Sequence, residues 1–242
     1  MGSWSFLRHL LAPFQNERMR GFAICTAPRS GSNYLCQLLT STFKLGAPLE
    51  YFNGSSRRVL DDPFYPDDPR KQIEKIRTSG ATPNRIYGLK LFMYQNEHVS
   101  REIAWADLLP DLHFISLHRN DIIGQAISWS RAEQTGQYRA SQSAKAVPVY
   151  SAEHISLQMQ RIRHEYAGWE AYFEANNIIP LRLIYEQVEA DPQSAIDRVA
   201  TFMGVDTPCL VDMKKVSVVR QSDSNSVAWR ERFLSDQPDP AK

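Results

Sequence analysis

The sequence predicts an α/β fold with a central, mainly parallel sheet flanked by helices. Short apolar, strand-like segments alternate along the chain with segments of helical periodicity, and this alternation is typical of strand–helix–strand units. The chain has 242 residues, 43% of them hydrophobic, and no internal repeat. A chain of this length and composition can bury one core of ordinary size, so we expect a single domain spanning residues 1–242.

The N-terminal half contains two of the predicted strands. Residues 1–14 have an apolar face that is too short to span a membrane and no signal cleavage site, which predicts a short packing helix. Residues 22–27 (FAICTA) form the first strand, and apolar spacing over residues 34–39 predicts a helix soon after it. Residues 53–84 are rich in Asp, Pro, Arg and Ser, so we expect a long, mobile surface loop before the strand at 86–92.

The C-terminal half contains the other two strands, at residues 112–118 and 181–185. Residues 136–150 have weak periodicity and predict a second mobile surface loop. A shorter helix begins at Pro192 and ends at Gly204. One long helix is predicted by apolar residues that recur at spacings of four and three: Ile155, Met159, Ile162, Tyr166, Trp169 and Phe173.

Composition excludes several classes of function. The formal net charge of +1 gives no basic field for nucleic acid. The three cysteines, Cys25, Cys36 and Cys209, are odd in number and widely spaced, which favours a reducing cytoplasm over a secreted, disulfide-bonded protein. The six histidines have no metal-ligand spacing, so we expect no metal site. We expect no transmembrane segment.

The turn after the first strand predicts an anion-binding site. Residues 27–33 (APRSGSN) would present backbone N–H groups at a helix N-terminus, where the helix dipole favours negative charge. Gly31 lets the chain pass close to a ligand, Arg29 adds a permanent cation, and the Ser30 and Ser32 hydroxyls donate hydrogen bonds. The turn lacks the Gly-Lys-Ser/Thr ending that reaches triphosphate and magnesium. A plain strand–helix turn with a serine cap is the alternative.

A second cation follows the strand at 112–118. In a parallel sheet, Arg119 would stand at the carboxyl edge, where ligands bind. A magnesium-dependent phosphotransferase would be expected to place an acidic residue there. Together the two turns suggest a ligand with two separated anionic groups and no obligatory metal. The alternative is a surface ion pair between Arg119 and Asp121.

Several motifs, taken in order, resemble the bacterial trehalose 2-sulfotransferase family. They are TAPRSGSNYL, GAPLEYF at 46–52, GLKLFMYQN at 88–96, HRNDIIGQAISWSRAEQTGQY and RQSDSNSVAWRERF at 220–233. The resemblance implies a P-loop nucleotide-kinase-like three-layer fold. It also implies transfer of a sulfuryl group from 3′-phosphoadenosine 5′-phosphosulfate (PAPS), without a metal, to a hydroxyl of a sugar or glycolipid precursor. A homodimer is a further expectation.

On the donor side, the resemblance implies that Arg29 and the N–H groups that follow it stabilise charge on the leaving oxygen. Arg119 would bind the 3′-phosphate, helped by Ser128 or, if the helix begins early, by Gln125. The implied cofactor-binding residues are Arg29, Ser30, Gly31, Ser32, Asn33, Arg119, Ser128, Arg220 and Trp229. For Trp229, packing is the slightly favoured interpretation over stacking on the nucleotide.

On the acceptor side, the resemblance implies that Glu50 is the general base. The implied substrate-binding residues are Glu50, Tyr51, Phe52, Lys90, Gln95, Arg131 and Gln134. Where the family's trehalose enzymes have Gly-Glu-Pro, this chain has Ala47 between Gly46 and Pro48, so the identity of the acceptor stays open. Without the resemblance, Glu50 would be interpreted as a solvated loop carboxylate. His118 is the next candidate base, although a satisfied histidine at a strand end is the expected structure.

Two other functions remain open from the sequence. An ATP-dependent phosphotransferase would share the fold, but the lysine and aspartate that bind triphosphate and magnesium are missing. A nucleotide-binding module without catalysis would keep the loops and lose the base, and the presence of Glu50 argues against it.

Overall fold

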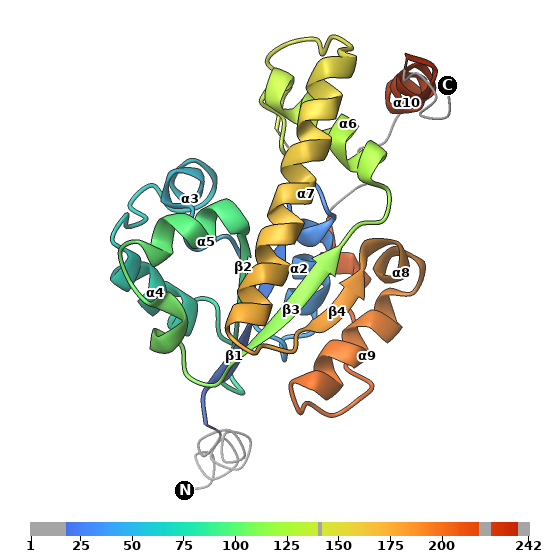
Figure 1. Ribbon diagram of the computed structural model, residues 1–242. Helices are drawn as coiled ribbons and strands as arrows, with labels where there is room; N and C mark the ends of the chain where they lie inside the picture. The colour runs from blue at the N-terminus through green and yellow to red at the C-terminus, as the bar shows by residue number, and fades with distance from the viewer. Residues whose placement is uncertain (1–17, 140–141, 218–223, 237–242) are drawn as a thin grey trace, which may run out of the picture.

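The computed structural model describes residues 18–139, 142–217 and 224–236. Four parallel strands form a central sheet in the order β2-β1-β3-β4 (Figure 1). All four predicted strands are confirmed, although the first begins and ends earlier than predicted. The last ends one residue early, because Tyr185 already begins a helix. Their bounds are β1 (Arg20–Thr26), β2 (Ile86–Phe92), β3 (Leu112–His118) and β4 (Leu181–Ile184).

Helices lie between the strands and follow the last strand. Those between strands are α2 (Ser32–Ser41), α3 (Gly54–Leu60), α4 (Pro69–Thr78), α5 (Met93–Ser100), α6 (Ile122–Thr135) and α7 (Ala152–Ala175), and those after β4 are α8 (Tyr185–Ala190), α9 (Pro192–Phe202) and α10 (Ser224–Asp236). Two short 3₁₀ turns are η1 (Trp105–Leu108) and η2 (Met213–Lys215). The predicted long helix is confirmed as α7, and the predicted helix from Pro192 is confirmed as α9.

Alternation along β1 builds a core on each face of the sheet. Phe22 and Ile24 point to one face, where they pack with α2 and α9, while Ala23 and Cys25 point to the other, where Trp169 of α7 covers them. These four residues of β1 are all buried, as expected for a central strand of a parallel sheet. Figure 1 shows α7 crossing the front of the sheet and α2 lying behind it.

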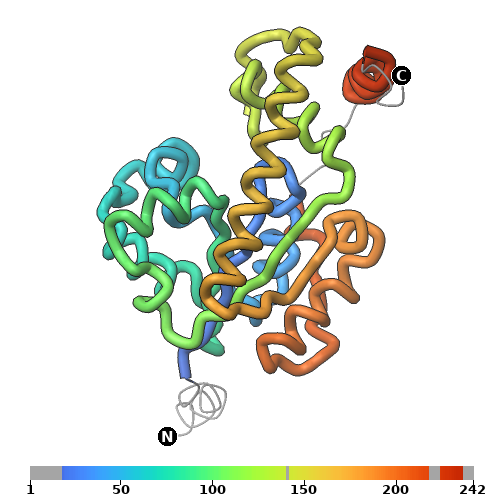
Figure 2. Tube along the Cα trace, viewed as in Figure 1, coloured from blue at the N-terminus to red at the C-terminus, as the bar shows by residue number. Residues whose placement is uncertain are grey.

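The prediction of a continuous loop over residues 53–84 is wrong. The segment contains α3, capped by Asn53, and α4, capped by Asp68 with a proline at its start. The helix α4 buries only Gln72, Ile73 and Ile76, so its apolar stripe is too sparse for periodicity to reveal. In the predicted loop at 136–150, the described residues form neither helix nor strand, and they connect α6 with α7 at the top of Figure 2. The predicted N-terminal helix lies outside the described residues.

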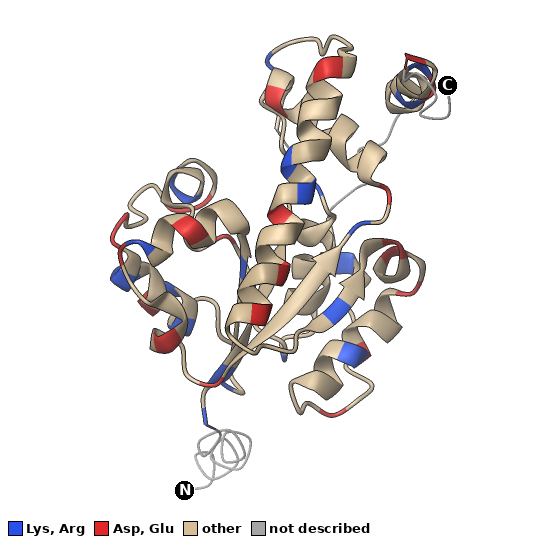
Figure 3. Ribbon diagram, viewed as in Figure 1, with Lys and Arg blue, Asp and Glu red and all other residues tan. Residues whose placement is uncertain are grey.

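The parallel arrangement brings the carboxyl ends of all four strands to one edge of the sheet. The chain leaves β1 into the loop before α2, β2 into α5, β3 into the turn before α6, and β4 into α8. Lys, Arg, Asp and Glu are distributed over the described part of the chain without separation by sign (Figure 3). Among the described residues, no helix has the length and apolar character needed to cross a membrane.

Candidate active site

The loop between β1 and α2 has a strained backbone that leaves the start of α2 open. Arg29 and Gly31 have positive φ angles of 62° and 85°. At Gly31 an added Cβ would collide with the ring of Tyr185, so both the backbone conformation and the space require glycine. The N-cap residue is Gly31, and no side chain of the described residues caps the helix. The serine-cap interpretation is therefore wrong: Ser30 is buried and accepts a hydrogen bond from Thr26 (2.8 Å).

Arg29 ties the loop to α6 and to the connection that follows it. Its Nε donates to Ser128 Oγ (3.0 Å) and its Nη1 to the carbonyl of Tyr138 (2.6 Å). Burial of the guanidinium and the nearby charge of Arg119 lower the pKa of Arg29 to about 10, so it stays charged at neutral pH. Ser128, expected as a helper of Arg119, thus contacts Arg29 instead.

Arg119 lies beside the same loop, and one nitrogen of its guanidinium makes no hydrogen bond to the described residues. Its Nη1 donates to the Arg29 carbonyl (3.3 Å), its Nη2 approaches Asp121 (3.4 Å), and its head lies over the Tyr185 ring at 5.2 Å. Its Nε is buried and has no hydrogen-bond partner among the described residues. A buried donor without a partner is costly, which makes this atom a candidate for contact with an anionic ligand.

Gln125, the other expected helper of Arg119, supports the loop. Its amide donates to the Pro28 carbonyl (2.7 Å) and accepts from the Tyr166 hydroxyl (3.2 Å). The same hydroxyl accepts the backbone N–H of Arg119 (3.1 Å). Gln125 and Tyr166 therefore join the two anion-facing turns through a buried hydrogen-bond chain.

Glu50 is held in a polar cluster and is not a solvated loop carboxylate. Its side chain is 21% exposed, and Oε1 lies 2.7 Å from Lys90 Nζ. The amides of Asn53 (3.0 Å) and Gln95 (3.2 Å) donate to Oε2. Burial alone would raise the pKa of Glu50, but the ammonium and the two amides hold it at about 2.

Lys90 connects this carboxylate to the anion loop. It is the fifth residue of β2, next to β1 in the sheet, and its side chain is only 3% exposed. Its Nζ donates to Asn33 Oδ1 (2.7 Å) on the first turn of α2. A single buried ammonium thus bridges the candidate base and the candidate donor site.

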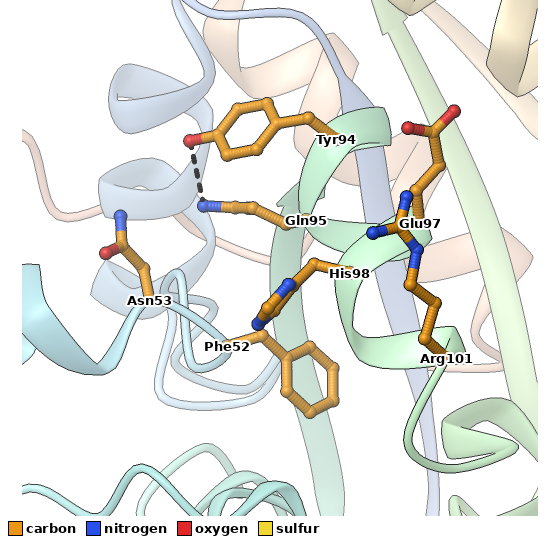
Figure 4. A pocket seen from close by; sticks show the side chains of 7 residues that line it. All are labelled: Phe52, Asn53, Tyr94, Gln95, Glu97, His98 and Arg101. Atoms are coloured by element: carbon orange, nitrogen blue, oxygen red, sulfur yellow. Dashed lines mark hydrogen bonds between the residues drawn. The ribbon is translucent and has the colours of Figure 1, made fainter.

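A cavity of about 380 Å³ lies beside the Glu50 cluster (Figure 4). Its lining residues are Phe52, Asn53, Tyr94, Gln95, Glu97, His98 and Arg101. Of these, Phe52 and Gln95 were predicted and the other five were missed. The signal for four of the five was available: they are polar or aromatic residues that follow β2 directly, at the sheet edge where ligands bind.

Three predicted acceptor residues have other partners. Tyr51 lies in the core with its hydroxyl donating to the Ala47 carbonyl (2.9 Å). Arg131 donates to Ser226 of α10 (2.5 Å). Gln134 donates to the Val149 carbonyl (3.0 Å) in the connection between α6 and α7.

The closing helix α10 contacts the start of α6, next to Arg119. Arg230 Nη1 lies 2.5 Å from Asp121, the N-cap residue of α6. Trp229 packs against Tyr150, with ring centroids 5.7 Å apart. Arg220, predicted to bind the nucleotide, lies outside the described residues, as does Gln221.

His118 packs as a strand-end residue against α7. Its ring stacks on Tyr166 at 4.1 Å, and burial lowers its pKa although Glu170 lies nearby. Its Nε2 lies 3.6 Å from Glu170 Oε1, within ion-pair distance, but makes no hydrogen bond to the described residues. No group of three or more His, Cys, Asp or Glu within the described ranges has a metal-binding arrangement.

Known sulfotransferases are similar to this chain in sequence or in structure. The chain is 27% identical, over 92% of its length and 97% of the relative, to a trehalose 2-sulfotransferase of Mycobacterium tuberculosis. It is 27% identical, over 91% of its length and 97% of the relative, to one of Mycolicibacterium smegmatis. A crystal structure of a sulfotransferase from Alicyclobacillus acidocaldarius matches with a TM-score of 0.51 at 15% identity, covering 91% of this chain and 97% of that one. The likeness confirms the P-loop-like fold.

A family model described as Stf0 sulphotransferase matches residues 21–236. The match confirms the expected activity class, a sulfotransferase, and favours neither a phosphotransferase nor a module without catalysis. Because it spans nearly the whole chain, this protein belongs to the Stf0 sulphotransferase family.

Proposed function

We propose that this sulfotransferase moves the sulfuryl group of PAPS to a hydroxyl of a carbohydrate or glycolipid precursor, with Glu50 as the general base. One observation carries the proposal: Lys90 contacts both Glu50 and Asn33, each at 2.7 Å. The candidate base is therefore one side chain away from the loop that would bind the transferring group. Such proximity is what an in-line transfer requires of its base.

The donor side fits a nucleotide with two anionic groups. The open N-terminus of α2 suits the 5′-phosphosulfate, because its N–H groups and the helix dipole favour anions. Arg29 would stabilise negative charge on the leaving oxygen. The Nε of Arg119, which has no hydrogen-bond partner among the described residues, is the observation that supports a second anion, the 3′-phosphate.

In the transfer, the acceptor oxygen forms a bond to sulfur while the bond from sulfur to the phosphate oxygen breaks. The electron pair of the broken bond stays on the phosphate oxygen, where Arg29 and the loop N–H groups stabilise it. The Glu50 carboxylate accepts the hydroxyl proton. The products are a sulfate ester and 3′-phosphoadenosine 5′-phosphate (PAP).

The low pKa of Glu50 limits its strength as a base. At neutral pH the carboxylate is ionised and can accept a proton, but Lys90 makes it hold that proton weakly. A loose transition state, of the kind described for phosphoryl transfer, forms little bond to the nucleophile and needs little proton removal before sulfur has moved. We propose that Glu50 acts late, as the new bond completes.

The acceptor side suits a polyhydroxylated molecule. The cavity offers the aromatic faces of Phe52 and Tyr94 beside the amides of Asn53 and Gln95. A second cavity of about 810 Å³ shares Phe52, Asn53 and His98 with the first, which leaves room for an acceptor larger than one sugar ring. The two curated relatives are named for trehalose, and this supports a carbohydrate here without fixing which one.

The first experiment tests the donor. PAP should raise the Tm in buffer containing EDTA, because binding to the native state stabilises it and no metal is required. ATP and adenosine 5′-phosphate should shift the Tm much less, because each lacks the 3′-phosphate. Equal shifts from PAP and adenosine 5′-phosphate would contradict a 3′-phosphate site at Arg119.

The second experiment tests the base. A screen of carbohydrate acceptors with sulfur-labelled PAPS identifies a substrate, and Glu50→Gln is then compared with the wild type. Transfer should fall by roughly 10²- to 10⁴-fold, the usual contribution of a positioned base, while PAP affinity is kept. Glu74→Gln, at an exposed position of α4, is the matched control and should behave as wild type. Transfer near the wild-type rate in Glu50→Gln would remove Glu50 as the base.

We also propose that the enzyme works in the cytoplasm as a homodimer. The cysteines support the reducing compartment, because all three are buried and free. Sedimentation equilibrium of the purified protein tests the dimer: a molecular mass of one chain would contradict it.

A further inference from the structure

Glu165 is a buried carboxylate that the transfer chemistry above does not use. It lies on α7, the long helix in front of the sheet, and is only 6% exposed. Its Oε2 accepts the backbone N–H of Met93 (2.6 Å) and its Oε1 that of Tyr94 (3.3 Å). Both oxygens therefore serve the first two residues of α5.

The first turn of α5 depends on this contact. The helix has no acidic residue in its first turn, and its N-cap residue, Phe92, has no polar side chain. Gly168, one turn along α7, allows the close approach, because a Cβ there would lie 2.7 Å from Met93 Cγ. A carboxylate from a neighbouring helix thus replaces the local cap that the sequence of α5 lacks.

Gln95, the third residue of α5, extends the chain of contacts to Glu50. Its Oε1 accepts the backbone N–H of Phe92 (3.0 Å), which fixes the amide at the start of the helix. Its Nε2 donates to Glu50 Oε2 (3.2 Å) and to the Tyr94 hydroxyl (3.3 Å). Any movement of the first turn of α5 would move this amide relative to the carboxylate.

We infer that Glu165 is a positioning residue for sulfuryl transfer: its carboxylate holds the first turn of α5 and, through Gln95, orients Glu50 toward the acceptor. The inference rests on the proposed function of Glu50. It assigns no contact between Glu165 and substrate, and it predicts that the acceptor site, not the donor site, responds when Glu165 is changed.

The charge of Glu165 makes this role sensitive to pH. Burial raises the pKa of Glu165 to about 7. The two backbone N–H groups favour the ionised form and lower the pKa, but their effect is smaller than that of burial. Glu97 on α5 raises the pKa further, and His164 on α7 lowers it. Above this pKa the carboxylate accepts both N–H groups. Below it, one oxygen carries a proton and would face a donor, so one of the two hydrogen bonds is lost.

The first test needs no substrate. Hydrogen exchange of the peptide that contains Met93 and Tyr94 is followed by mass spectrometry from pH 5.5 to 8.5, with intrinsic rates divided out. In the wild type, protection of these amides should increase about 10-fold or more as the pH rises through the pKa of Glu165. In Glu165→Gln it should be low at every pH, because the amide NH₂ faces one of the N–H donors.

The matched control is Glu174→Gln, at an exposed position of the same helix, which should follow the wild-type exchange curve. The second test measures transfer with the acceptor found by the labelled-PAPS screen. The acceptor KM should rise at least 10-fold in Glu165→Gln with the PAPS KM unchanged, and the wild-type acceptor KM should fall as the pH rises through 7.

The inference is overturned if the wild-type amides of Met93 and Tyr94 exchange at their intrinsic rates at pH 8.5, a result that needs no variant and is unaffected by whether Glu165→Gln folds. It is also overturned if Glu165→Gln matches Glu174→Gln in acceptor KM. Exchange that follows the expected curve in a protein that transfers no sulfuryl group would uphold the anchoring of α5 and reject the proposed function instead.

Discussion

At the scale of single residues, the ammonium of Lys90 connects the candidate base, Glu50, with Asn33 at the candidate donor site. An ammonium group has three N–H donors, and the described residues supply two acceptors, Glu50 and Asn33. Under the proposed function, the third donor would be available to an oxygen of the transferring group. Burial makes these contacts strong and makes the loss of any of them costly.

The first prediction concerns the pH dependence of transfer. With Lys90 present, the pKa of Glu50 is about 2, so kcat/KM should show no loss from Glu50 protonation down to pH 4. Lys90→Met removes the cation and leaves the burial, which raises the pKa of Glu50. An acidic limb should therefore appear in the measurable range, with activity lost below it, as recorded with saturating PAPS and varied acceptor.

Lys90→Arg is the control for this prediction, because it keeps a cation and should show no new acidic limb from Glu50. The stability should follow the same linkage. The pKa of Glu50 is lowered in the native state, so its contribution to the free energy of unfolding is present above the unfolded value of 4.5 and lost as the pH falls toward 2. An unchanged profile in Lys90→Met would contradict electrostatic control of Glu50 by Lys90.

The second prediction separates the two arginines. Arg119→Ala should weaken PAP binding by roughly 10- to 100-fold, the effect of one charge-assisted hydrogen bond, with little change in kcat. Arg29→Ala should chiefly lower kcat, because its cation is needed most as charge develops. Calorimetric titration with PAP and steady-state transfer decide between them. Exchanged phenotypes would mean that the nucleotide binds in the opposite direction.

At the scale of elements, the loop before α2 concentrates backbone strain where the donor would bind. Gly31 adopts a left-handed conformation and packs against the ring of Tyr185, so two separate reasons exclude any larger residue. Arg29, a residue with a side chain, also has a positive φ, of 62°, and such strained conformations are typical of ligand-binding turns.

The third prediction uses a pair of glycines. Gly31→Ala should lower the free energy of unfolding by more than the ~1–2 kcal/mol that a left-handed alanine costs, and should abolish measurable PAP binding. Gly204→Ala is the matched control: its φ is also positive, at 65°, but the space around it is open. It should lose only the backbone cost and keep PAP affinity. Urea denaturation and titration calorimetry measure both, and equal losses in the two variants would contradict the collision with Tyr185.

The elements differ in how well the sequence predicts them. The strands and α7 were predicted because most of their buried positions are apolar: β2 is an apolar run interrupted by Gly88 and Lys90, and α7 carries a long apolar stripe. The helix α4 was missed because its stability comes from the Asp68 cap and a few contacts, although Asp68-Pro69 is a recognisable start signal. The helix α5 has almost no amphipathic pattern, and its anchor, Glu165, is 72 residues away in the sequence.

The candidate site could be predicted only where a short local motif identifies a residue. Arg29 was predicted from the residue types of its turn, and Glu50 from a family motif a few residues long. The contact of Lys90 with both Glu50 and Asn33 depends on the pairing of β2 with β1, which no local pattern reveals. Ser128 was assigned to Arg119 because spacing along α6 does not indicate which neighbouring arginine its hydroxyl faces.

At the scale of the whole molecule, the loop between β1 and α2, called the donor loop below, continues directly from an interior strand of the sheet. The strand β1 that carries it lies between β2 and β3, and both of its faces are covered by helices. Under the proposed function, a nucleotide bound at the end of this strand would stabilise the native state by binding linkage. The three free cysteines report on that packing, because each is fully buried: Cys25 in β1, Cys36 in α2 and Cys209 beyond α9.

The fourth prediction is that these thiols react only when the fold opens. Burial raises the pKa of all three, to about 11 for Cys36, so both access and ionisation oppose reaction in the native state. Labelling by iodoacetamide should then follow the population of open molecules. PAP at one hundred times its Kd should slow it ~100-fold, which corresponds to about 2.7 kcal/mol of added stability.

Peptide mass spectrometry resolves the three rates. Equal slowing at Cys25, Cys36 and Cys209 would show that the loop, the sheet and the segment after α9 open as one unit. A smaller effect at Cys209 would show that this segment opens without disturbing the donor loop. A thiol that reacts in the native protein as fast as in urea would contradict its burial, and an absence of any PAP effect on Cys25 and Cys36 would contradict the placement of the donor at the end of β1.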